Sequence, residues 1–221
     1  MSGGYLLYGD VGSGAVAVEA ALVLARQPYD LIEAPTSEPD DPAGGDRVLA
    51  ANPLRQVPAL VLPSGETMTE SAAILIWLAE QHPEAGLAPA AGDPARAAFL
   101  RWMAFVSAAI YSLYWVKDDP ARLAPDPAAQ PALVARTLDR ISECWGMMEA
   151  QVSPGRYILG DRLTVLDLYV TVVSRFNPRR QRFYDVAPRL GEVVRRVDAD
   201  PRLAAFWPAR YPFDPGWDRP S

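Results

Sequence analysis

The chain contains almost no cysteine or histidine. Among its 221 residues there is one cysteine, Cys144, and one histidine, His82. A single cysteine cannot form an intramolecular disulfide, and one histidine with one cysteine cannot supply a zinc site built only from nitrogen and sulfur ligands. These counts favour a reducing compartment, and they predict that the protein holds no metal.

Long apolar runs and large basic clusters are scarce as well. No run of about eighteen apolar residues occurs, and the segment from Met1 to Tyr8 lacks the charged and apolar regions of a secretory signal. The formal net charge is -6, and basic clusters such as 179–182 are short, which leaves no electrostatic footprint for nucleic acid. We therefore expect a cytoplasmic protein that binds neither nucleic acid nor a membrane.

What the sequence does contain is an alternation of strand and helix signals in its first part. A β-α-β unit makes the first two strands parallel, and the turn Pro63-Ser64-Gly65 makes the last two antiparallel. This βαβαββα order predicts a small mixed sheet with helices on its faces. The expected elements are a strand at 5–8, a helix at 15–26, a strand at 28–33, a short helix ending near 51, strands at 57–62 and 66–69, and a helix at 71–81.

Strand signals almost vanish in the rest of the chain. Thr164 and Asp167 have the spacing of a capping box at the start of a helix. We therefore predict an α/β domain at 1–83, a linker rich in Pro, Gly and Ala at 84–93, and an all-α domain at 94–221. Its amphipathic helices are expected at 94–117, 131–151, 164–176 and 188–197.

The most informative segment joins a proline-led strand to a helix that begins at an acid and a serine. An X-Pro bond costs only about 0.5–1 kcal/mol to hold cis, so Val57-Pro58 is a feasible bend that exposes the backbone groups of Val57. Glu70 and Ser71 begin the helix, where free N–H groups and the helix dipole favour an anion. Either feature alone is ordinary, as a strand-entry proline or an N-cap serine. Together they predict a peptide-like anion held at a helix N-terminus.

Three motifs in combination resemble the cytosolic glutathione S-transferase superfamily, and the likeness covers nearly the whole chain. The resemblance implies a thioredoxin-like N-terminal domain that binds glutathione, an all-α C-terminal domain that forms the second-substrate site, and a homodimer. The motifs are Asn52-Pro53 leading into Val57-Pro58-Ala59-Leu60, the helix start Glu70-Ser71-Ala72-Ala73-Ile74, and Gly160-Asp161-Arg162-Leu163-Thr164-Val165-Leu166-Asp167.

The resemblance also implies which residues contact glutathione. Val57 and Pro58 would present backbone groups to its cysteinyl unit in the manner of a strand edge. Glu70 would face the ammonium group of the γ-glutamyl unit, and Ser71 would bind the carboxylate of the same unit.

The glycyl carboxylate of glutathione needs a further donor from the segment between residues 34 and 56. Arg55 and Gln56 are the candidates, with Arg47 nearby. The acidic residues of 38–46 oppose a bound anion there, so the sequence leaves this assignment open.

The implied chemistry is activation of a thiol. A free thiol has a pKa of roughly 8.5, so lowering it by about two units needs about 2.7 kcal/mol of preferential thiolate stabilisation. A hydrogen bond to a charged group supplies about 1.5–3 kcal/mol, so one hydroxyl at a helix N-terminus is sufficient. Ser13, between Gly12 and Gly14 at the start of the first helix, meets this requirement, although it also suits a simple N-cap. Tyr8, at the end of the first strand, is the alternative donor.

The helix expected from Pro94 carries large apolar side chains on more than one face. Aromatic and aliphatic residues recur from Phe99 to Trp115, so part of this set is expected to line a cleft or an interface rather than the core. The residues that we assign to a second-substrate pocket are Tyr111, Tyr114, Trp115, Arg175 and Phe176.

Three functions are consistent with these features. The first is a glutathione transferase that uses glutathione as cosubstrate, attacks a small hydrophobic electrophile and serves in detoxification. The same site would also suit a glutathione-dependent peroxidase, disulfide reductase or isomerase. The third is a non-catalytic ligand-binding or interaction protein, which the apolar run Ala15-Val16-Ala17 beside Ser13 would allow.

Overall fold

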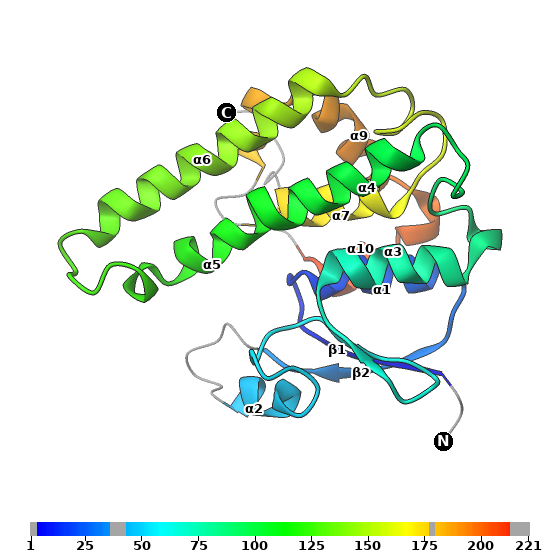
Figure 1. The fold of residues 1–221 in the computed structure, drawn as a ribbon, viewed down its shortest axis with the longest axis horizontal. Coiled ribbons are helices and arrows are strands. Elements are labelled where there is room, and N and C mark those ends of the chain that lie inside the picture. Colours follow the sequence, from blue (N-terminus) through cyan, green and yellow to red (C-terminus); the bar gives the residue numbers. More distant parts are fainter. Residues whose placement is uncertain (1–3, 36–42, 177–179, 213–221) are drawn as a thin grey trace.

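A four-stranded mixed sheet forms the first part of the molecule. The computed structural model describes residues 4–35, 43–176 and 180–212 of the chain (Figure 1). The first strand pairs parallel with the second and antiparallel with the third, and the third pairs antiparallel with the fourth, which confirms the expected sheet. In sheet order β2-β1-β3-β4, the strands are β1 (Tyr5–Gly9), β2 (Tyr29–Glu33), β3 (Ala59–Val61) and β4 (Thr67–Met68).

Helices cover both faces of this sheet. They are α1 (Ala15–Leu24), α2 (Ala43–Leu49) and α3 (Ser71–Gln81). Figure 1 shows α1 and α3 on one side of the sheet and α2 on the other. Because side chains alternate along a strand, β1 directs Tyr5 and Leu7 into the large core with α1 and α3, whereas Tyr8 packs against a smaller cluster that contains Val48 and Ala59.

The strand β3 is shorter than the strand expected at 57–62. It begins at Ala59, directly after a cis peptide bond between Val57 and Pro58. Proline has no backbone N–H to donate to a ladder, so the pairing with β1 covers only the three residues of β3. The turn that follows agrees with the expectation, because Gly65 adopts a φ of 88°, which glycine accepts without steric cost.

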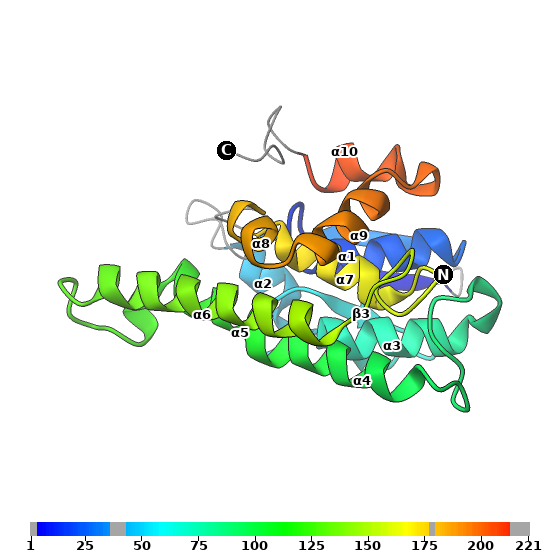
Figure 2. The same ribbon diagram turned by 90° about the horizontal axis from the view of Figure 1, so that it is seen from above.

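Helices make up most of the remaining chain, and α5 and α6 form a hairpin that extends away from the sheet (Figures 1 and 2). The helix expected at 94–117 continues through a π-helical segment, η2, between α4 and α5. The helices α8 and α10 were not expected, because helices of six and five residues are too short to show a clear periodic pattern. The elements are η1 (Pro83–Ala85), α4 (Arg96–Phe105), η2 (Val106–Tyr111), α5 (Ser112–Asp118), η3 (Pro120–Arg122), α6 (Gln130–Gln151), α7 (Val165–Ser174), α8 (Gln181–Val186), α9 (Pro188–Asp198), η4 (Pro201–Leu203) and α10 (Phe206–Arg210).

The helix α7 lies at the centre of the helical part. All of its residues are buried, and it packs against α1, α3 and α9, so the core continues from the sheet into the helices (Figure 2). The expected capping box is confirmed, because Asp167 Oδ2 accepts hydrogen bonds from the N–H of Thr164 at 2.7 Å and from its hydroxyl at 2.8 Å. Asp167 also accepts the N–H of Ile158 at 2.8 Å, which ties the preceding loop to α7.

The segment 84–93 packs more closely than its linker-like composition indicates. Leu87 is 3% exposed, and its carbonyl accepts the N–H of Val165, the first residue of α7, at 2.8 Å. This segment therefore joins the α/β part to the start of the central helix at a defined position.

Candidate active site

The loop between β1 and α1 places Ser13 at the first turn of α1. Its hydroxyl is half-buried, donates to the carbonyl of Asp10 at 2.7 Å and accepts the N–H of Ala15 at 3.2 Å. The hydroxyl oxygen therefore already lies where the free N–H groups of the helix converge. To donate to a thiolate at the same place, the hydroxyl proton must turn away from Asp10.

Tyr111 meets the same helix end from η2. The N–H of Gly14 hydrogen-bonds to the Tyr111 hydroxyl, and burial raises the pKa of Tyr111 above its usual value. A Cβ at position 14 would lie 2.1 Å from this hydroxyl oxygen, so only glycine fits there without displacing Tyr111. The aromatic residue that we assigned to the pocket from sequence therefore also forms part of the Ser13 environment.

The alternative hydroxyl, Tyr8, lies at the end of β1 on the side of α2. It packs with Val57 against the cluster of Ala34, Val48 and Ala59. Tyr8 is thus close to the bend that precedes β3, whereas Ser13 lies at a helix N-terminus. The helix dipole favours a negative charge beside Ser13, and no comparable helix end begins at Tyr8.

Val57 lies just outside the ladder between β1 and β3. Its cis bond to Pro58 precedes the first paired residue, Ala59. Backbone groups at such a position are available to an extended peptide, which can add to the edge of the strand.

Glu70 and Ser71 form the turn at the start of α3. Glu70 is exposed and has a φ of 66°, an uncommon backbone conformation for a residue other than glycine that clusters at functional sites. Ser71 is 6% exposed, and its hydroxyl donates to the hydroxyl of Tyr169 on α7 at 3.0 Å. Tyr169 was not predicted as a site residue, because in the sequence an aromatic residue in an apolar helix cannot be distinguished from an ordinary core residue.

The candidates for the glycyl carboxylate already have partners in the structure. Arg55 forms an exposed ion pair with Asp46 at 3.1 Å, and Arg47 donates to the carbonyl of Glu33 at 3.1 Å. The carbonyl of Gln56 accepts a hydrogen bond from Asn52 at 2.8 Å. The acidic positions 38, 40 and 41 lie outside the described residues.

Three of the five residues assigned to the second-substrate pocket form one aromatic group. The ring of Phe176 lies 5.1 Å from the ring of Tyr111 and 5.1 Å from that of Tyr114. Trp115, which follows Tyr114 in the chain, is 43% exposed, and its ring stacks with the guanidinium of Arg122.

Arg175, beside Phe176 in the chain, faces the C-terminal aromatic residues. Its guanidinium lies 4.7 Å from the ring of Trp207 and 5.0 Å from the ring of Tyr211. Burial lowers the pKa of Arg175 to about 10 although Asp198 pairs with it. Tyr211 was not assigned to the site from sequence because it lies in a proline-rich tail without periodicity.

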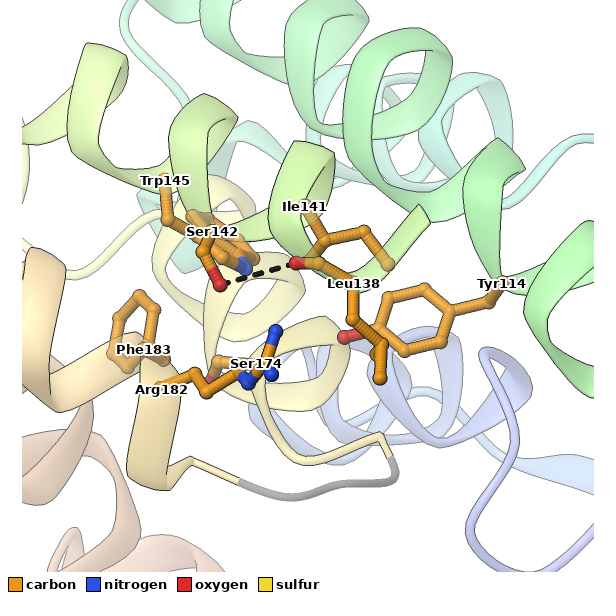
Figure 3. Close-up of a pocket in the computed structure, with 8 residues that line it drawn as sticks. All are labelled: Tyr114, Leu138, Ile141, Ser142, Trp145, Ser174, Arg182 and Phe183. Atoms are coloured by element: carbon orange, nitrogen blue, oxygen red, sulfur yellow. Dashed lines mark hydrogen bonds between the residues drawn. The ribbon is translucent and has the colours of Figure 1, made fainter. Parts of the chain in front are cut away.

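A separate cavity lies among α5, α6, α7 and α8 (Figure 3). Its volume is about 10 Å³, room for about one water molecule. It shares Tyr114 with the aromatic group but is too small for an organic substrate. Its lining residues are Tyr114, Leu138, Ile141, Ser142, Trp145, Ser174, Arg182 and Phe183.

Two family models match the chain. The glutathione S-transferase N-terminal domain matches residues 15–81, and the glutathione S-transferase C-terminal domain matches residues 127–210. With the mixed sheet followed by a helical part, these matches define the class, and the chain belongs to the glutathione S-transferase superfamily.

Individual relatives resemble the chain over most of its length. It is 29% identical over 197 residues to YncG of Escherichia coli strain K12, an uncharacterized GST-like protein, covering 89% of this chain and 94% of that one. A glutathione transferase homolog from Sulfitobacter with bound glutathione has a TM-score of 0.80 and 26% identity, covering 91% of this chain and 95% of that one. A sphingomonad glutathione S-transferase complexed with glutathione has a TM-score of 0.75 and 25% identity, covering 93% and 98%.

Proposed function

We propose that the protein is a glutathione transferase that stabilises the thiolate of bound glutathione for attack on a small hydrophobic electrophile. The observation that carries the proposal is the Ser13 hydroxyl, which lies at the first turn of α1 and accepts the Ala15 N–H at 3.2 Å. The Sulfitobacter and sphingomonad relatives, whose structures hold glutathione, support the choice of cosubstrate.

In this proposal the α/β domain, 1–83, binds glutathione as an extended peptide. Val57 and Pro58 present the bend before β3 to the cysteinyl unit, and the γ-glutamyl unit reaches Glu70 and Ser71 at the start of α3. The carboxylate of the γ-glutamyl unit would accept the hydrogen bond that the Ser71 hydroxyl donates to Tyr169 in this structure. Arg55 or Gln56 would bind the glycyl carboxylate, and Arg55 would then exchange Asp46 for this ligand.

The chemical step is the loss of the thiol proton to solvent, followed by formation of a bond between sulfur and an electrophilic carbon. Where the electrophile carries a leaving group, that group departs with the electron pair of its bond to carbon. One hydrogen bond from Ser13 to the thiolate supplies about 1.5–3 kcal/mol, which corresponds to a thiol pKa lowered by about one to two units. The N–H groups at the start of α1 add to this effect.

The electrophile would bind against the aromatic group of Tyr111, Tyr114 and Phe176, in the helical domain 94–221 that follows the linker 84–93. Tyr111 contacts the start of α1 through Gly14, so this group borders the proposed position of the thiolate. An apolar surface beside a thiolate favours reaction by proximity. We do not place Trp115 in this group, because it is 43% exposed and its ring stacks with the guanidinium of Arg122.

A homodimer in the cytoplasm, acting in detoxification, completes the proposal. Among the described residues one continuous helix, Arg96–Asp118, is long and apolar enough to cross a membrane by length and composition, and 33% of its most apolar window is buried. Its exposed apolar residues include Leu100 and Trp115. A second copy of the chain would cover this face, and the molar mass in solution tests this.

The test of Ser13 is a titration of bound glutathione followed by the ultraviolet absorbance of its thiolate. Ser13→Ala is expected to raise the apparent thiol pKa by about one to two units. Ser64→Ala is the matched control, because Ser64 lies in the exposed turn between β3 and β4. An unchanged pKa in Ser13→Ala would remove Ser13 from the mechanism, and a raised pKa in Tyr8→Phe would assign the role to Tyr8.

The same protein can be assayed for the alternative reactions. The cosubstrates are an apolar aryl halide, an organic hydroperoxide and a mixed disulfide of glutathione, each with and without Ser13→Ala. Retention on immobilised glutathione without turnover of any of them would favour the non-catalytic function.

A further inference from the structure

The C-terminal end of α10 closes onto the loop that carries Ser13. The carbonyl of Arg210 accepts the N–H of Gly12 at 3.0 Å. The ring of Tyr211, which is 8% exposed, lies 4.0 Å from the position of a Cβ at Gly12. Figure 2 shows α10 on the same side of the molecule as α1 and α9. The last described helix therefore contacts the first loop directly.

The Arg210 side chain also binds acidic residues of α1 and β2. Its Nε and Nη2 donate to the two oxygens of Glu19 at 2.7 and 2.9 Å, a bidentate pair. Its Nη1 donates to Glu33 at the end of β2. Glu19 is 0% exposed in the middle of α1, and Tyr29 donates to it at 3.3 Å. The guanidinium is thus held by carboxylates from α1, which follows the Ser13 loop, and from β2, where Glu33 pairs in register with Gly9 just before that loop.

Arg210 therefore contacts three parts of the structure around Ser13. The side chain of Arg210 holds the body of α1 and the end of β2, while its carbonyl holds the loop at Gly12. Within the described part of the chain, the Ser13 hydroxyl hydrogen-bonds to groups of that same loop and turn, Asp10 and Ala15. A shift of the loop would therefore change the direction in which Ser13 donates.

We propose that Arg210 is a positioning residue that fixes the loop of Gly12 and Ser13 and thereby sets the strength with which Ser13 stabilises the thiolate. The inference rests on the proposed function of Ser13 and extends it to a residue in the C-terminal helix. Arg210 does not contact the thiol; it acts through the backbone of the loop. Its effect should therefore fall on the thiol pKa and on turnover, and much less on glutathione affinity.

The variants must separate positioning from folding. Arg210→Met alone would leave the carboxylate of Glu19 buried beside the Tyr29 hydroxyl, and that cost can unfold a protein. The double variant Glu19→Gln with Arg210→Met removes both charges together, so it avoids the cost of an unpaired buried carboxylate. Arg210→Lys keeps the charge without the bidentate geometry. Arg182→Met is the control, because Arg182 forms an exposed ion pair with Asp139 at 3.1 Å, so its loss leaves no buried charge.

The first measurement is amide hydrogen exchange of the peptide 9–14 in the full chain without glutathione. The double variant should exchange at least about tenfold faster in this peptide, as expected when a local contact that holds the loop closed is lost. The exchange rate of Arg210→Lys should fall between those of the double variant and the wild type, and the rate of Arg182→Met should match that of the wild type. Unchanged exchange in the folded double variant would overturn the proposal.

The second measurement is the thiolate titration with glutathione bound. The double variant should raise the apparent thiol pKa by about one unit and lower kcat/KM at neutral pH about tenfold, with glutathione Kd changed less than about threefold. Faster exchange with an unchanged thiol pKa would also overturn the proposal. Failure of the wild-type protein to bind glutathione or lower its thiol pKa would instead refute the proposed function, which the exchange measurement does not use.

Discussion

Replacing Tyr169 with phenylalanine removes one oxygen that joins the two halves of the molecule. Tyr169 is 0% exposed on α7, and its hydroxyl accepts a hydrogen bond from Ser71 at 3.0 Å. Ser107, in the π-helical segment η2, also hydrogen-bonds to it. The ring remains in the core, so the substitution tests the hydroxyl alone.

The effects on stability and on binding should have opposite signs. Ser71 is 6% exposed, and a buried hydroxyl without its partner costs about 1–3 kcal/mol of folding stability. A domain pair of this size loses roughly 2–4 °C in Tm for each kcal/mol. On the proposed binding of the γ-glutamyl carboxylate to Ser71, glutathione would have to displace Tyr169 in the wild type, and a net hydrogen bond is worth about 0.5–1.5 kcal/mol. Tyr169→Phe should therefore bind glutathione about two- to tenfold more tightly.

The assay combines thermal unfolding with calorimetric titration of glutathione. Tyr5→Phe is the control, because it also removes a mostly buried hydroxyl, one that hydrogen-bonds to His82 at 2.8 Å near the end of α3. The control should lose stability and keep its glutathione affinity. Weaker binding in Tyr169→Phe would refute the reasoning, because it would show that Tyr169 orients Ser71 for the ligand rather than competing with it.

Two further predictions concern a buried acid and a crowded glycine. Burial raises the pKa of Asp167 from 3.8 to about 6, so its contribution to stability is fully present below the unfolded pKa and is lost as pH rises through about 6. The stability of the wild type relative to Asp167→Asn, measured by denaturant unfolding, should fall by about 3 kcal/mol between about pH 3 and about pH 7, and a constant difference would contradict this. Gly14→Ala should displace Tyr111, whose hydroxyl oxygen would lie 2.1 Å from the new Cβ, and should both lower Tm and raise the thiol pKa. Gly92→Ala, which meets no atom within 4 Å, should change stability by less than about 0.5 kcal/mol, and equal effects of the two substitutions would show that the contact at Gly14 is unimportant.

Local signals in the sequence were sufficient for the type and order of most elements. The turn Pro63-Ser64-Gly65 needs a positive φ at its glycine, and the structure has it at 88°. Thr164 and Asp167, three residues apart, form the capping box at the start of α7. Such features depend on groups that are neighbours in the chain, so they are present in the sequence before any tertiary contact forms.

Charged residues were the least predictable from composition. The sequence shows only that the basic cluster 179–182 is short, whereas in the structure Arg180 is 0% exposed and pairs with Asp198. Arg210 and Glu19 form a bidentate pair although they are 191 positions apart. A charge can be buried only where an opposite charge is already placed, and that placement depends on how helices pack.

Short-range signals thus predict the mixed sheet, the helical second part, the capped start of α7 and the bend at Val57-Pro58, because propensity, turn chemistry and periodicity act over a few residues. Three contacts depend instead on tertiary packing: Ser71 donates to Tyr169, the N–H of Gly14 meets Tyr111, and the N–H of Gly12 donates to the carbonyl of Arg210. Each of these contacts joins segments that are remote in the chain. Their partners are brought together by the packing of α7 against α1 and η2 and by the contact of α10 with α1, which no local pattern encodes.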